Sequence, residues 1–209
     1  MYNSFGKRLI DITLSAIMLV VTSPVMLIAA IAIKLSSKGP IVFKQIRMGK
    51  DHQPFKLYKF RSMRIDTPEI ASNDLNGDDY HTAVGKFIRK FSIDELPQLF
   101  NVIKGDMSII GPRPVILKET NLIELRHQNG AEKVRPGITG LAQVNGRDNL
   151  ADEPKAMYDG QYAKKVSLKN DGKIFMQTIL YVIKRDGVVE EQIDDDSTVD
   201  KKIKNKDPK

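Results

Sequence analysis

Residues 12–33 form an uninterrupted run of 22 residues without a charged side chain, and this run restricts the possible folds of the chain more than any other feature. A helix of that length is about 33 Å long, close to the roughly 30 Å hydrocarbon core of a bilayer. A signal peptide would have a shorter apolar region followed by small residues, whereas this run leads directly into Lys34. The run therefore predicts a retained membrane segment. A buried helix of a soluble core is the alternative, but so long an apolar run is unusual in a chain whose mean hydropathy is −0.29.

Basic residues flank the apolar run on both sides. Lys7 and Arg8 precede it, several lysines and arginines follow it, and residues 12–50 contain no acidic residue. Because Lys and Arg favour the cytoplasmic side of a membrane, both ends of the helix are expected there. Ser23 and Pro24 lie near the middle of the run, where the proline removes a backbone donor and favours a bend. The sequence thus favours a helix that re-enters the same leaflet, and a kinked helix that crosses the membrane once is the alternative.

The charge of the chain is strongly positive. Thirty-three Lys and Arg residues against 26 Asp and Glu residues leave a net charge of +7, and residues 34–64 alone carry nine basic residues and one acidic residue. This balance predicts an acidic partner, such as phosphate groups, nucleic acid or an anionic membrane surface, and the membrane segment argues against nucleic acid. The absence of cysteine excludes disulfides and thiol nucleophiles, and the three histidines lack the spacing of a helical zinc motif.

The rest of the chain predicts an α+β fold that is predominantly helical with a small β-hairpin. Residues 41–43 and 55–58 have the composition of strands on either side of a turn at 48–51. Helices are expected at four places: two pieces within 85–104 that end at Gly105, one at about 115–128 and one at 173–185. Loops are expected at 66–82, 111–114 and 135–140. The expected domains are a re-entrant membrane helix (1–36), a cytosolic catalytic domain on the membrane surface (37–188) and a charged, disordered tail (189–209).

The short segment 92–98 contains an acidic pair, Asp94 and Glu95. Ser92 with Glu95 has the spacing of a capping box, but Pro97 fits the first turn of a helix better if Asp94 is the N-cap. In that register the pair lies at a helix N-terminus, which favours phosphate, so one carboxylate could attack phosphorus and the other could hold Mg²⁺. Acidic pairs at helix starts are more often caps, so the spacing leaves both interpretations open.

Two arginines, Arg113 and Arg147, lie in loops stiffened by glycine or proline. A guanidinium fork binds phosphate in a bidentate manner, and a stiff loop loses little entropy in presenting it. A solvated arginine in a surface turn is the alternative for each loop. The chain has neither a Walker A motif nor a GxGxxG motif, so the usual nucleotide-binding loops are absent.

Taken together, these segments resemble the monotopic phosphoglycosyl transferases, a family of bacterial sugar transferases, and in particular its small members with a minimal catalytic domain. The resemblance spans about residues 5–187 and rests on nine collinear motifs: Lys7–Asp11, Thr22–Pro24, Gly39–Pro40, Phe43–Gln45, Lys59–Met63, Ser92–Gln98, Gly111–Pro114, Arg135–Gly140 and Asn145–Arg147.

The resemblance implies a reaction and a site. Members move a phosphosugar from a UDP-sugar to polyprenol (undecaprenyl) phosphate, release UMP and form a phosphosugar-aspartyl intermediate. On this chain Asp94 would be the nucleophile and Glu95 the ligand of the Mg²⁺ cofactor. The expected phosphate-binding residues are Arg89, Arg113, Arg147, Lys59 and Arg61.

The resemblance also implies a place in the cell. The helix would break at Ser23 and Pro24 and return to the cytoplasmic leaflet of the bacterial cytoplasmic membrane, so the active site would face the cytoplasm. The reaction would be the first membrane step of a glycoconjugate, exopolysaccharide or capsule pathway. A second copy of the chain and pathway glycosyltransferases are further candidate partners.

Two other functions remain open at the level of the sequence. A glycosyltransferase would release UDP and form no aspartyl intermediate, and a membrane-anchored scaffold would need neither Asp94 nor Glu95. The identity of the donor sugar, whether acetamido, galactosyl or glucosyl, does not follow from these motifs.

Overall fold

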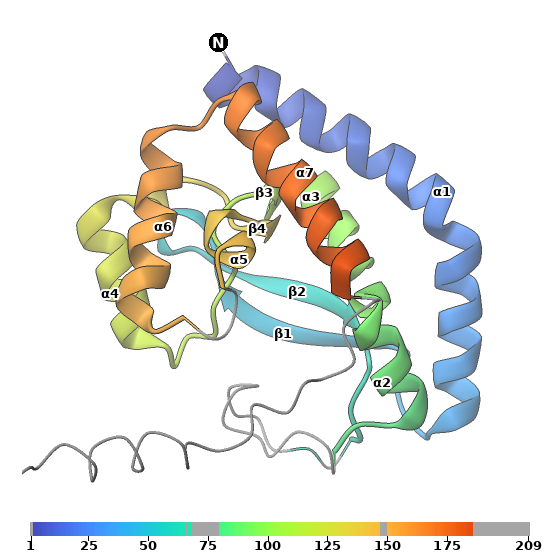
Figure 1. The fold of residues 1–209 in the computed structure, drawn as a ribbon. Coiled ribbons are helices and arrows are strands. Elements are labelled where there is room, and N and C mark those ends of the chain that lie inside the picture. The colour runs from blue at the N-terminus through green and yellow to red at the C-terminus, as the bar shows by residue number, and fades with distance from the viewer. Residues whose placement is uncertain (1, 66, 68–79, 147–149, 186–209) are drawn as a thin grey trace, which may run out of the picture.

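The computed structural model describes residues 2–65, 67, 80–146 and 150–185 (Figure 1). A short π-helical turn, Tyr2–Gly6, leads into the long helix α1 (Lys7–Ser36), which forms one flank of the molecule. Helices α4 (Thr120–Asn129) and α6 (Asp152–Lys164) pack together on the opposite flank, and the hairpin of β1 (Val42–Met48) and β2 (Pro54–Phe60) runs between the two flanks. Helices dominate and the sheets are small, which confirms the predicted α+β class.

The resemblance implied a break at Ser23 and Pro24, but helix α1 is continuous through Pro24 and curves along its course (Figure 1). Since Pro24 has no N–H, the carbonyl of Val20, four residues earlier, loses its helical partner. The hydroxyl of Ser23 donates to that carbonyl at 2.8 Å, and the hydroxyl of Thr22 donates to the carbonyl of Met18 at 2.7 Å. The side chain beside the proline therefore replaces the missing bond, as expected for a bend built into an apolar helix.

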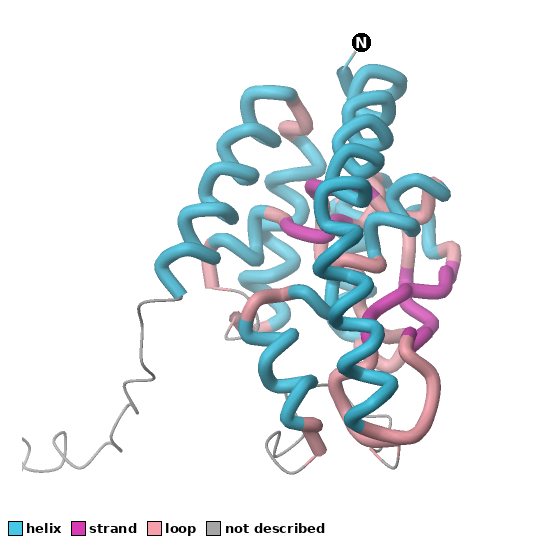
Figure 2. The backbone as a smooth tube through the Cα atoms, turned by 90° about the vertical axis from the view of Figure 1, so that its right-hand side faces the viewer, coloured by secondary structure: helices cyan, strands magenta, loops and turns pink. Residues whose placement is uncertain are grey.

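Helix α1 also lies against the rest of the molecule at both of its ends, and Figure 2 shows that it runs along nearly the whole height of the molecule. Asp11 and Ser15 are buried near its N-terminal end, and Ala29 and Ile33 are buried near its C-terminal end. The stretch between them has exposed apolar side chains, with Val20 and Val21 at 75% and 70%. Both ends are thus held by one folded body.

The predicted hairpin is confirmed. Strands β1 and β2 pair antiparallel from Val42 opposite Phe60 to Met48 opposite Pro54. The connection contains a short 3₁₀ turn, Lys50–His52, in which Asp51 and His52 both have positive φ angles of 51° and 58°.

A second, parallel pair of strands was not predicted. β3 (Ser108–Ile110) pairs with β4 (Gly137–Thr139), and the latter falls in a segment that the sequence predicted to be a loop. Gly111 lies so close to this pair that a Cβ atom on it would be 2.3 Å from the carbonyl oxygen of Arg135. A Cβ atom on Gly140 would be 2.0 Å from the carbonyl oxygen of Gly111. The two glycine-containing loops are therefore packed against each other.

The four predicted helices are found, but their bounds are corrected and two further helices are present. Helices α2 (Ala83–Lys90) and α3 (Gln98–Lys104) are the two expected pieces, and Gly105 ends α3 with φ 105°. Helix α4 begins at Thr120 instead of about residue 115, because the carbonyl of Val115 accepts from the N–H of Met48 in an extended contact. Helix α7 (Leu168–Arg185) begins five residues earlier than predicted. Two helices were missed: α5 (Leu141–Val144) and α6.

Two apolar clusters join these elements. The larger cluster lies where the hairpin, α3, β3, α6 and α7 meet, and it includes Leu57, Val102, Met107 and Ile174. The smaller cluster attaches the C-terminal half of α1 to the hairpin and α2 through Ala29, Ile33, Phe60 and Ile88. The predicted tail and most of the predicted loop at 66–82 lie outside the described residues.

Candidate active site

The acidic pair lies in a 3₁₀ turn, Ile93–Glu95, between α2 and α3. The assignment of Asp94 as N-cap was wrong, because α3 begins only after Pro97. Ser92 does stand at the N-cap position of the 3₁₀ turn, but its side chain makes no capping hydrogen bond, so the predicted capping box is absent. Ser92 has a left-handed backbone with φ 55°, which turns the chain out of α2. Pro97, with φ −61°, needs no N–H partner at the start of a helix. The carboxylates are therefore not used as helix caps.

Glu95 lies between two cations that come from distant parts of the chain. The Nζ atom of Lys59, at the end of β2, is 2.8 Å from Oε1 of Glu95. The Nη1 atom of Arg113 is 3.5 Å from the same oxygen. Glu95 is 17% exposed and Arg113 is 40% exposed, so the cluster opens toward solvent on the side of Arg113.

Asp94 is buried, with 6% of its surface exposed. Burial is the main cause that raises the pKa of Asp94, and the negative charge of Glu95 adds to it. The positive charges of Lys59, Arg89 and Arg113 lower the pKa of Asp94 and oppose that shift. Five residues predicted from the sequence, namely Asp94, Glu95, Lys59, Arg89 and Arg113, are thus brought into one electrostatic cluster.

Asn101 fixes the distance between the acidic pair and Lys59, and sequence analysis missed it. Its side chain is fully buried on α3 and pairs with the backbone of β2 as a neighbouring strand would. Nδ2 of Asn101 donates to the carbonyl of Lys56 at 2.7 Å, and Oδ1 accepts from the N–H of Tyr58 at 3.0 Å. A single asparagine within the apolar stretch that follows the acidic pair was the one available signal.

Arg126 and Asp159 hold the loop that carries Arg113, and they were also missed. Nη1 of Arg126 donates to the carbonyl of Arg113 at 2.9 Å. Nε and Nη2 of Arg126 donate to Oδ2 of Asp159 at 2.9 and 2.6 Å, and Asp159 is fully buried. The pair joins α4 to α6 and positions the backbone of Arg113 beside the acidic pair.

Arg61 was expected to bind phosphate, but in the structure its guanidinium binds backbone carbonyls. The side chain is buried and donates to the carbonyls of Ser37 and Lys38 at 2.8 and 2.7 Å, just after the end of α1. Arg61 therefore stabilises the exit of the chain from α1 and is not part of the cluster around Glu95. Arg147 lies outside the described residues.

The acidic pair fits the needs of Mg²⁺, which takes one or two carboxylates from a protein and completes its shell with water and phosphate oxygens. Within the described ranges, no group of three or more His, Cys, Asp or Glu residues could form an all-protein metal site. Glu95 and Asp94 could instead hold Mg²⁺ with one or two carboxylates, while water and phosphate oxygens complete its shell.

The candidate site lies beside the apolar helix. Ile93, the neighbour of Asp94, packs against the cluster that holds Ala29 and Ile33 of α1. By length and composition α1 is a candidate membrane helix, and only 11% of its most apolar 18-residue window is buried. A core helix of a soluble protein would be mostly buried, so the exposed surface of α1 indicates membrane association.

Comparison with known proteins finds one family profile and several relatives of the same kind that match most of this chain. The profile of the bacterial sugar transferase family matches residues 2–185. The chain is 42% identical over 190 residues to the UDP-glucose:undecaprenyl-phosphate glucose-1-phosphate transferase of Klebsiella pneumoniae. The matched region covers 85% of this chain and 40% of that protein. The chain is 43% identical to the UDP-N-acetylgalactosamine-undecaprenyl-phosphate N-acetylgalactosaminephosphotransferase of Aeromonas hydrophila, over 86% of this chain and 44% of that protein.

The chain thus spans less than half the length of these two relatives. It is also 41% identical to the uncharacterized sugar transferase EpsL of Bacillus subtilis, over 87% of this chain and 89% of that protein. A family profile that matches almost the whole described chain, together with relatives at about 40% identity, shows that this protein belongs to the bacterial sugar transferase family.

Proposed function

We propose that this protein transfers a phosphosugar from a UDP-sugar to undecaprenyl phosphate, releasing UMP and forming undecaprenyl diphosphosugar. The observation that carries the proposal is the buried carboxylate of Asp94 within a cluster of Glu95, Lys59, Arg89 and Arg113. Relatives named as undecaprenyl-phosphate sugar phosphotransferases support the substrate class.

Asp94 is the nucleophile in this proposal. An oxygen of its carboxylate attacks the sugar-bearing phosphorus of the diphosphate, the phosphorus–oxygen bond to UMP breaks, and UMP leaves with the bonding pair. A phosphate oxygen of undecaprenyl phosphate then attacks the same phosphorus, and the bond to Asp94 breaks to restore the carboxylate. Burial supports this role, because it removes the water shell that would weaken the carboxylate as a nucleophile.

The cations around Asp94 reduce the repulsion between an anionic nucleophile and an anionic diphosphate. Lys59 and Arg113 already face Glu95, and Arg89 acts on Asp94 from the last turn of α2. Arg113 is the most accessible partner of Glu95 and is positioned to bind a phosphate oxygen. A Mg²⁺ ion held by Glu95 and Asp94 would supply further neutralisation of the diphosphate charge.

We also propose that α1 enters and leaves the membrane from the cytoplasmic side. Its two ends pack on one body and its exposed middle contains the Ser23–Pro24 bend, which supports a re-entrant helix over one that crosses the bilayer. The active site then lies at the membrane surface, where a soluble UDP-sugar and a lipid phosphate can meet. The donor sugar and the pathway are left open by these residues.

Nucleotide release tests the reaction. The full chain in nanodiscs with Mg²⁺, undecaprenyl phosphate and a panel of UDP-sugars is expected to release UMP with one donor class. Asp94→Asn and Glu95→Gln are each expected to lower turnover by at least about 10³-fold, because the first removes the nucleophile and the second removes the carboxylate proposed to hold Mg²⁺. Asp152→Asn, which changes a half-buried aspartate on α6 bonded to exposed Asn121, is the control and is expected to keep full activity.

The nucleotide released distinguishes the alternatives. UDP in place of UMP would indicate an ordinary glycosyltransferase, and full activity in Asp94→Asn would rule out the assignment of the nucleophile. Membrane binding without any nucleotide release across the panel would favour a scaffold.

A further inference from the structure

A cavity of about 240 Å³ lies at the N-terminal end of α1, apart from the candidate active site. Its charged lining residues are Lys7, Arg8, Lys50, Lys133 and Arg135 together with one acidic residue, Asp11. None of the residues that surround Asp94 lines it. The two sites lie at opposite ends of α3, because Asp94 precedes this helix and Arg8 donates to the carbonyls of Val102 and Ile103 in its last turn.

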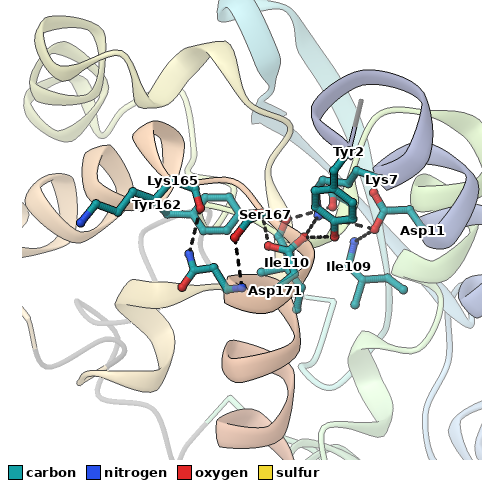
Figure 3. Close-up of polar contacts among 11 residues, drawn as sticks. Tyr2, Lys7, Asp11, Ile109, Ile110, Tyr162, Lys165, Ser167 and Asp171 are labelled. Atoms are coloured by element: carbon teal, nitrogen blue, oxygen red, sulfur yellow. Dashed lines mark hydrogen bonds and ion pairs between the residues drawn. The ribbon is translucent and has the colours of Figure 1, made fainter.

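Two of the five cations are already neutralised. The Nζ atom of Lys7 is 2.6 Å from Oδ2 of Asp171, and Figure 3 shows this pair beside Asp11. The Nζ atom of Lys50 is 3.5 Å from Oδ2 of Asp51.

The other three cations, Arg8, Lys133 and Arg135, form no ion pair with a carboxylate among the residues that the structure describes. Arg8 and Arg135 donate to backbone carbonyls at the end of α3, and the bond from Nε of Arg135 to the carbonyl of Gly105 is 2.9 Å. Those bonds cap the helix, but a carbonyl is neutral, and the carboxylates of Asp11 and Asp106 offset the charge of Arg8 only from a distance. Three cations without a paired carboxylate around one cavity favour an anion with several acceptor oxygens.

The position of the cavity indicates where such an anion would come from. Phe5 and Leu9 lie close in sequence to Lys7 and Arg8, which line the cavity. They are 78% and 55% exposed and continue the apolar surface of α1. With α1 in the bilayer, the cavity lies at the depth of the phospholipid headgroups, where basic pockets beside membrane helices bind anionic lipids.

We propose that this cavity is a second phosphate site, which binds the headgroup phosphate of an anionic phospholipid. Arg8, Lys133 and Arg135 contact the phosphate oxygens, and the acyl chains lie along the exposed face of α1. The site is separate from the proposed reaction and would anchor the N-terminal end of α1 at the membrane surface.

Binding to the full chain in neutral detergent tests the proposal without a sugar donor. Native mass spectrometry would follow the protein with added phosphatidylglycerol, with phosphatidylcholine and with inorganic phosphate. We expect one tightly held phosphatidylglycerol and weaker binding of phosphatidylcholine. Lys133→Glu is expected to weaken phosphatidylglycerol binding about tenfold, because it reverses a charge beside the phosphate.

Matched variants separate a site from a general effect of charge. Lys133 is exposed, and its side chain forms no hydrogen bond or ion pair with the residues that the structure describes. Lys169→Glu makes the same charge change at an exposed position on α7 outside the cavity. Lys133→Arg is expected to keep binding, and Asp94→Asn is expected to bind as the unmodified protein does.

Each outcome decides the proposal. Equal loss of binding in Lys133→Glu and Lys169→Glu, or equal binding of both lipids, would overturn it. Inorganic phosphate that binds with the same dependence on Lys133 while phosphatidylglycerol does not would also overturn the lipid as the source and would leave a site for a soluble phosphate.

Discussion

Lys59 is the residue on which the electrostatics of the candidate site depend most. Its ammonium group is 2.8 Å from Glu95 and is the largest influence that lowers the pKa of buried Asp94. Without it, two neighbouring carboxylates would have to ionise with less compensation for burial and mutual repulsion. A nucleophilic carboxylate must be ionised, so this lysine couples the chemistry to pH.

Replacing Lys59 should therefore change the pH profile. The pKa of Asp94 is already raised, so activity is expected to fall on the acidic side at a higher pH than for an ordinary aspartate. Lys59→Met raises that pKa further. The pH at which kcat for UMP release falls on the acidic side, the acidic limb of the pH profile, should therefore rise by about one pH unit. Lys56→Met, an exposed lysine on the same strand, is the control and should leave the limb in place. An unchanged limb in Lys59→Met would mean that Asp94 does not limit the rate through its charge.

At the scale of elements, the Arg126–Asp159 pair shows how two helices set the position of a loop. Burial raises the pKa of Asp159, while the guanidinium of Arg126 lowers it by charge and by hydrogen bonds. The same guanidinium holds the carbonyl of Arg113. Helices α4 and α6 thus act on the candidate site without contributing a side chain to it.

Asp159→Asn should leave the Arg126 charge buried without its counter-ion. We expect a loss of about 3 kcal/mol in the free energy of unfolding, because an unpaired buried charge is costly. Thermal unfolding of the protein in detergent, followed by circular dichroism, measures it. The matched control is Asp152→Asn on the same helix, whose partner Asn121 is exposed, and a change within about 0.5 kcal/mol is expected there. A similar small change in both variants would show that the buried pair contributes little.

The topology of α1 is the second question at this scale. The chain has no cysteine, so single cysteines at Ser4 and Lys38 report on the two ends of the helix. For a re-entrant helix, a membrane-impermeant maleimide should label neither position in intact cells and both after permeabilisation. A helix that crosses the bilayer would expose one of the two positions on the outside.

Across the whole molecule, the beginning and the end of the described chain meet in one buried polar network. The carboxylate of Asp171 on α7 accepts from Tyr2 and Lys7 at 2.6 Å each and from Tyr162 at 2.9 Å (Figure 3). Burial raises the pKa values of both tyrosines, so their hydroxyls keep the protons that they donate. The N–H of Ile109 donates to Asp11 on the same face of α1. This network holds the N-terminal end of α1 on the rest of the folded body.

Asp171→Asn should weaken that attachment. The variant leaves Lys7 partly buried without its closest carboxylate, and we expect a loss of about 3 kcal/mol in stability together with faster hydrogen exchange in the first turns of α1. Asp51→Asn, which removes an exposed pair with Lys50, should change neither quantity. Protection of α1 that is the same in both variants would count against the network as its anchor.

The sequence by itself determined the features that depend on neighbouring residues. The length of the apolar run determined α1, the short apolar segments on either side of a turn determined the hairpin, and Gly105 determined the end of α3. Pro24 removed one backbone donor from α1, and Ser23 replaced the missing bond. Each of these follows from a local preference: burial of an apolar surface, a missing N–H, or a backbone angle that glycine tolerates. The acidic pair was found by its motif, although its local geometry was not.

Only the tertiary structure decided which distant side chains meet. β3 and β4 are three residues each, too short for a periodic pattern, and their pairing depends on glycines that allow two loops to approach. Lys59 reaches Glu95 because Asn101 ties α3 to β2, and no local signal connects those segments. Arg61 was predicted to bind phosphate and instead binds two carbonyls after α1. A guanidinium suits both acceptors equally, so its role is set by which oxygens the fold brings within reach.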